Sequence, residues 1–140
     1  MDIDPYAPPR SDPGAPTGSI PAPLWNPDAA GIWSLLLTPV FGSLLILRNW
    51  QALGEEARTR QARGWLYASL LMLVPDLLIP FSSILYIIVW YYAWQRLQTR
   101  YIQERWGKDY PKKSWWKPVL IGFGIIIPLN LAVISLMNPL

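Results

Sequence analysis

Asp76 is the one charged side chain inside a long apolar stretch, residues 65–95, that contains no Lys or Arg. Acids within membrane segments typically act as proton relays, ion sites or salt-bridge anchors. Pro75 and Pro80 flank Asp76, however, and prolines around an acid are typical of a turn. Two interpretations stay open: an intramembrane functional carboxylate, or a carboxylate in the outer, solvated turn of a helical hairpin. The prolines favour the turn.

Asn130 is a polar residue in another apolar stretch, residues 118–140. Amide side chains in membrane helices hydrogen-bond to neighbouring helices. We therefore expect Asn130 to bond across to another helix, near Pro39 or Pro128. Neither Asp76 nor Asn130 has a second acid or a basic partner at helical spacing, which argues against a transport pathway.

A basic and aromatic cluster precedes this last apolar stretch. Its members are Lys112, Lys113, Trp115, Trp116 and Lys117. Lysines beside tryptophans can hold anionic lipid headgroups. Ordinary anchoring at the membrane–water interface explains them equally well, so both interpretations stay open.

The composition argues against an enzyme. The chain has no Cys and no His, which removes thiolate metal sites, the commonest metal ligand and the commonest general base. The sequence shows no nucleophile–base pair, metal cluster or phosphate-binding loop. We expect no cofactor, no metal and no catalytic residue. The 12 Lys and Arg residues indicate membrane orientation rather than nucleic-acid binding.

Long uncharged stretches alternate with charged blocks, and 52% of the residues are hydrophobic. This pattern predicts an all-α integral membrane protein, a small helical bundle of one domain over 25–140. Residues 1–24 are proline-rich and predict a disordered tail. The N-terminus lacks the basic region of a cleavable signal peptide.

Local signals mark the ends of several helices. Asn26 suits an N-cap and Pro27 the first helical position. The helix that follows covers 29–47, close to the roughly 20 residues that cross a bilayer, with a kink at Pro39. Gly42 and Ser43 offer a small surface for close helix approach. We also expect a turn near Gly54, a helix end at Gly107, and a last helix over 118–137.

The stretch 65–95 is too long for one crossing. One helix would measure about 46 Å, against a hydrocarbon core of roughly 30 Å. A break at Pro75–Pro80 gives a hairpin of 65–75 and 80–95. The loops 48–64 and 96–117, which hold 11 basic residues, then lie together in the cytoplasm, as the positive-inside rule favours. The arms are short, so the hairpin either crosses or is re-entrant.

The expected topology has four membrane segments and places both termini in the periplasm. Aromatic residues flank the basic loops and predict an interfacial belt. They are Trp50, Trp65, Trp94, Trp106, Tyr110, Trp115 and Trp116.

Several local patterns resemble an uncharacterised family of small bacterial inner-membrane proteins. They include Asp-Pro-Tyr-Ala-Pro-Pro over 4–9, Leu-Trp-Asn-Pro-Asp-Ala-Ala over 24–30, Asn-Trp-Gln-Ala-Leu-Gly over 49–54 and Tyr-Pro-Lys-Lys-Ser-Trp over 110–115. The resemblance implies a bacterial inner-membrane setting and carries over no activity. Some similar small proteins accompany secreted toxins as immunity partners.

These observations predict a non-enzymatic protein of the bacterial inner membrane whose partners are the lipid bilayer and a membrane or secreted protein. One concrete version is immunity against a membrane-active toxin. The alternative is a small transporter or channel subunit that uses Asp76 or Asn130.

Overall fold

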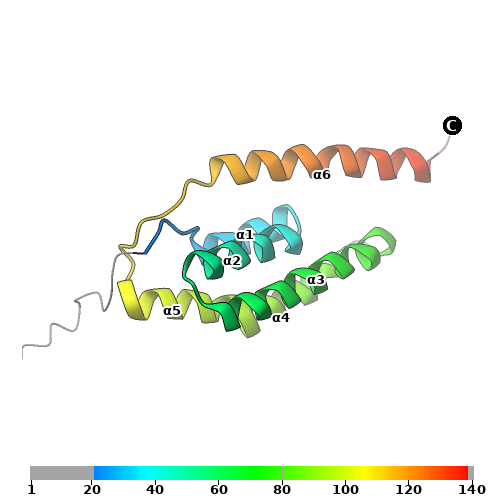
Figure 1. Ribbon diagram of the computed structural model, residues 1–140. Helices are drawn as coiled ribbons and strands as arrows, with labels where there is room; N and C mark the ends of the chain where they lie inside the picture. The colour runs from blue at the N-terminus through cyan, green and yellow to red at the C-terminus, as the bar shows by residue number, and fades with distance from the viewer. Residues whose placement is uncertain (1–20, 80, 139–140) are drawn as a thin grey trace, which may run out of the picture.

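The computed structural model describes residues 21–79 and 81–138. Within these ranges the protein is all-α and has no sheet, only an isolated parallel bridge between Leu24 and Lys112. The helices are α1 (Pro27–Leu36), α2 (Pro39–Ala52), α3 (Glu56–Leu78), α4 (Ser83–Trp90), the π-helical turn η1 (Tyr91–Gln95), α5 (Arg96–Trp106) and α6 (Trp116–Met137). Because α4, η1 and α5 run on without a break, they form one long helix (Figure 1).

Residues 29–47 form two helices that fold back on each other, not one kinked crossing, so that prediction is wrong. Thr38 is fully extended (φ −176°, ψ 161°), and Pro39 begins α2. Proline lacks an N–H and has a helical φ, so it starts a helix more readily than it bends one. The two helices touch: a Cβ atom on Gly42 would lie 1.9 Å from Ser34 Oγ. The close approach expected at Gly42 is confirmed.

α3 and α4 form a second hairpin. The reversal expected between Pro75 and Pro80 begins later than predicted, because α3 runs through Pro75 to Leu78. α4 returns antiparallel to α3, and the hydroxyls of Ser69 and Tyr86 lie 2.9 Å apart. The predicted hairpin is therefore present, with the turn displaced toward α4.

The π-turn η1 keeps one face of the long helix against the rest of the protein. Trp90, Trp94, Gln98 and Ile102 are buried at intervals of four residues. In a regular α-helix of 3.6 residues per turn, that spacing would rotate the face by about 120° over three intervals. A π-turn takes up extra residues and removes part of this rotation.

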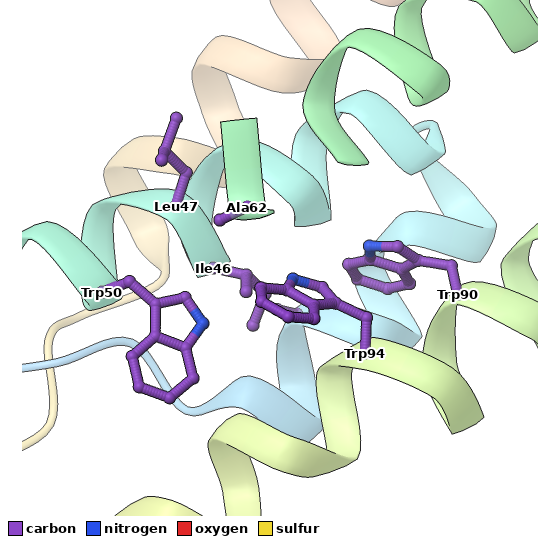
Figure 2. Close-up of a cluster of buried hydrophobic side chains, with 7 residues drawn as sticks. Ile46, Leu47, Trp50, Ala62, Trp90 and Trp94 are labelled. Carbon is purple, nitrogen blue, oxygen red and sulfur yellow. The ribbon is translucent and has the colours of Figure 1, made fainter. Parts of the chain in front are cut away.

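The core lies where α2, α3 and the long helix meet. Figure 2 shows Ile46 and Trp50 of α2, Ala62 of α3, Trp90 and Trp94 packed together. The rings of Trp50 and Trp94 have centroids 6.3 Å apart. Trp50 and Trp94 are 1% and 4% exposed, so the belt predicted for them is wrong: they are core residues.

α6 stands apart from the helical body formed by α1–α5. Val119 is its one buried residue, and a Cβ atom on Gly122 would meet Leu37 Cδ1 at 2.7 Å. Among the described residues, α6 is the one helix whose length and composition would let it cross a membrane.

The molecule has two unlike ends (Figure 1). The α1–α2 turn, the α3–α4 turn and the end of α6 point the same way, and we call this the apolar end. It exposes Leu36, Phe81 and Leu136 at 62%, 80% and 81%. The connector 107–115 and the last turn of α5 lie at the opposite, polar end.

Leu24 is fixed to the connector at the polar end. Its N–H donates to Pro111 O at 3.0 Å, and its carbonyl accepts from Lys113 N at 2.8 Å. Leu24 is buried, so order begins before residue 25. The start of the helical domain and the loop 96–117 are therefore neighbours, which contradicts their expected placement on opposite sides of a membrane. The predicted disorder of 1–20 lies outside the described residues.

Candidate functional site

A buried amide network joins the helices at the polar end. Asn49 Nδ2 donates to Trp25 O at 2.7 Å and to Gln98 Oε1 at 3.0 Å, while Asn49 Oδ1 accepts from Trp25 N at 3.0 Å. Gln98 Nε2 donates to Ile46 O at 3.0 Å. Sequence reasoning missed Asn49 and Gln98, because amides in polar segments are typical of solvated surfaces.

The network continues to the first turn of α1. Gln95 Nε2 donates to Pro27 O, and Thr99 Oγ1 donates to Asp28 Oδ1 at 2.9 Å. A Cβ atom on Gly31 would lie 2.6 Å from Gln95 Oε1, so any larger residue there would displace the Gln95 amide. The predicted cap is confirmed beside it, since Asn26 Oδ1 accepts from Asp28 N at 3.1 Å.

Two tyrosines at the polar end have perturbed acidity. Tyr101 donates to the Glu55 carboxylate, and the Arg105 guanidinium lies over its ring. Burial, then the Glu55 carboxylate, raises the pKa of Tyr101. Burial, then the negative charge of Asp28, raises the pKa of Tyr110. Both side chains therefore stay protonated near neutral pH, and Tyr101 links α5 to Glu55 at the start of α3.

Asp76 closes the α3–α4 turn. Its Oδ1 accepts from Ser82 Oγ and from Ser83 N, both at 2.7 Å. Ser83 is the first residue of α4, so the carboxylate also sits at the positive end of that helix. Within the described chain no ion pair involves Asp76. This arrangement is that of a turn and capping residue.

Asn130 bonds within its own helix. Its Nδ2 donates to Ile126 O at 2.9 Å, and the residue is exposed. In the described part of the chain, no hydrogen bond joins Asn130 to another helix. Asp76 and Asn130 lie on separate elements, the α3–α4 turn and α6, and the structure does not bring them together into one site.

An apolar groove with a volume of about 760 Å³ lies between α2 and α6. Its walls are side chains of both helices: Phe41, Leu44, Leu45, Ile121, Ile125 and Ile126. A groove of this size is in the range of small-molecule and cofactor sites, about 300–1,000 Å³.

Three cations line the same groove: Arg48, Lys113 and Lys117. Arg48 lies near the end of α2, Lys113 lies in the connector and Lys117 lies in the first turn of α6, so all three are at the polar end. Lys113 Nζ lies 4.0 Å from the Trp25 ring. None of the three makes an ion pair within the described residues. The groove is therefore apolar along most of its length and positively charged at the polar end.

The predicted basic and aromatic cluster is divided by the fold. Lys113 and Lys117 line the groove, whereas Lys112 lies over the Tyr110 ring at 5.1 Å. Trp115 packs against the core, and Trp116 is 70% exposed. Arg48 was missed because it lies far from the lysines in sequence, and the charge cluster exists only once α2 and the connector meet.

A scan against protein-family models finds no match, and neither the curated proteins nor the solved structures contain a match. The family resemblance seen in the sequence stays a prediction.

Proposed function

We propose that this is a bacterial inner-membrane protein that enters the bilayer from the cytoplasmic face and acts by binding a protein partner. The separation of a basic polar end from an exposed apolar end supports this orientation. Basic residues favour the cytoplasm and apolar helix ends favour hydrocarbon.

Helix lengths support one crossing and two re-entrant hairpins. α6, with 22 residues, is about 33 Å long, enough for a hydrocarbon core of roughly 30 Å. The apolar part of α3, residues 65–78, reaches about 21 Å, and α1 with its 10 residues about 15 Å. The two hairpins dip to different depths, and α6 carries the C-terminus to the periplasm.

This topology has a direct test, because the chain has no native cysteine. Single substitutions Pro23→Cys, Glu56→Cys and Asn138→Cys are treated with an impermeant maleimide in intact cells with a permeable outer membrane. We expect labelling at 138 alone in intact cells, and at all three sites after lysis. Labelling at 23 in intact cells would contradict this topology and support a periplasmic N-terminal segment.

We propose that the partner contacts the outward face of α6. The exposure of apolar side chains on this face is the observation that supports the proposed function. Leu120, Ile127 and Leu131 are more than half exposed on that face. Gly124 lies among them, and a Cβ atom there would meet nothing within 4 Å. Glycine at such a position lets the backbone of a second membrane helix approach closely. In the immunity version, the second helix belongs to a membrane-active toxin.

The substitution Gly124→Leu tests this contact, since the open space leaves the protein's own fold undisturbed. We expect it to abolish photo-crosslinking from residue 131 to a partner in native membranes. The matched control is Ala132→Leu, which adds similar bulk about 80° round the helix from Gly124.

Equal crosslinking in Gly124→Leu and in the control would contradict the proposal that the partner contacts this face. For the immunity version, deletion of the gene should sensitise cells to the effector encoded beside it. Unchanged sensitivity to any neighbouring effector would remove that version.

A further inference from the structure

The groove between α2 and α6 is amphipathic along its length. At the polar end it has Arg48, Lys113 and Lys117, and further along its walls are side chains such as Phe41, Leu44 and Ile125. The described residues that line it include no acid. A ligand that fits both parts carries a negative charge at one end and an apolar chain at the other.

We propose that this groove binds one anionic phospholipid. The phosphate lies against Arg48 and Lys117, with Lys113 beside them, and an acyl chain runs between α2 and α6 toward the apolar end. The inference rests on the membrane insertion proposed above, which puts the cations at headgroup depth and the groove walls in the hydrocarbon. Clusters of Lys and Arg at that depth recognise anionic headgroups.

The packing of α6 supports a lipid as the occupant. α6 touches the helical body around Gly122, while Leu44 and Ile121 on the facing walls remain exposed. A flexible acyl chain fills such an irregular space, which two rigid helices leave between them. The bound lipid then contacts both α6 and the helical body and helps to hold them together.

Native mass spectrometry of the purified full chain provides the test. The protein, in mild detergent, is offered equal amounts of phosphatidylglycerol and phosphatidylcholine with identical chains. We expect one phosphatidylglycerol to be retained in preference. The double variant Arg48→Gln/Lys117→Gln should weaken that retention about thirtyfold. Both residues are exposed, so the variant keeps the fold.

Matched variants separate the groove from general surface charge. Arg60→Gln/Lys108→Gln removes the same charge from exposed positions that do not line the groove, and it should retain the lipid like the parent protein. Leu44→Trp narrows the apolar part with the cations intact, and it should also lose the lipid. An unchanged thermal unfolding temperature, measured beside the parent protein, would show that the fold persists.

Several outcomes would overturn the inference. Equal retention of phosphatidylcholine would do so, as would equal loss in the Arg60/Lys108 variant. Competition by inorganic phosphate at the same concentration would indicate an anion site without a lipid. A protein helix crosslinked through residue 44 would replace the lipid as occupant. If the protein resists alkaline carbonate extraction but retains no lipid, only this inference fails; if carbonate extracts it, the membrane proposal fails as well.

Discussion

α2 and α6 are neighbouring apolar helices with opposite burial. α2 buries residues along most of its length, among them Gly42, Ile46 and Trp50, whereas α6 buries Val119 alone. In lipid, apolar surface gains little by leaving hydrocarbon, so helices associate through close packing and hydrogen bonds. α2 has both kinds of contact and α6 has few. The comparison indicates that α2 holds the fold together, while most of the surface of α6 stays open for the contact proposed above.

The largest effect on this contrast is expected from removal of the Asn49 amide, which joins α2 to the rest of the body. Asn49→Ala leaves the N–H and C=O of Trp25 and the Oε1 atom of Gln98 without their partner. Unsatisfied buried polar groups cost about 1–3 kcal/mol each, and we expect a loss of about 3 kcal/mol in the free energy of unfolding. Denaturation in mixed detergent micelles measures it.

The control for this change is Gln103→Ala, an amide on the exposed side of α5. It should stay within about 0.5 kcal/mol of the parent protein. If both variants lose the same stability, the buried network has no special role in holding the body together.

A smaller effect is expected at the α3–α4 turn. Asp76→Ala removes the acceptor for Ser82 and Ser83 and should lower stability by about 1 kcal/mol, as for a lost helix cap. Asp76→Asn keeps an acceptor oxygen and should recover most of that loss. A carboxylate that relays protons would behave differently: Asn would abolish flux in proteoliposomes as fully as Ala does, and the transporter alternative would gain support.

The smallest effect is expected on α6. Ile127→Ala shortens a side chain that is 54% exposed, so the free energy of unfolding should change by less than about 0.5 kcal/mol. The same variant should weaken crosslinking to the partner. A stability loss as large as that of Asn49→Ala would mean that α6 belongs to the body, and the contrast between α2 and α6 would not hold.

Local signals in the sequence predicted several features of the fold. The cap at Asn26, the turn at Gly54 and the helix end at Gly107 all follow from backbone preferences of single residues, and both glycines have positive φ angles. The hairpin over 65–95 followed from length and charge. These features depend on residues close together in the sequence and on long apolar stretches, and both can be recognised in a single sequence.

Features that depend on contacts between distant segments were missed. The link at Leu37–Thr38 contains no glycine, acid or asparagine, so a stretch of the right length resembled one crossing. Trp50 and Trp94 lie where an interfacial belt was expected, and position along the chain does not show which way a side chain faces. The groove needed Arg48 and Lys117 from two helices, and its charge cluster was invisible until those helices were placed.

The bridge between Leu24 and Lys112 has a consequence for biosynthesis. The Lys113 N–H that donates to the Leu24 carbonyl is synthesised only after α1–α5, because Lys113 follows all of them in the chain. Until these segments have emerged, the α1–α2 hairpin lacks both this hydrogen bond and its hydrogen bonds to the side-chain amides of the long helix. The α1–α2 hairpin can therefore form these contacts only late in translation, shortly before α6 emerges.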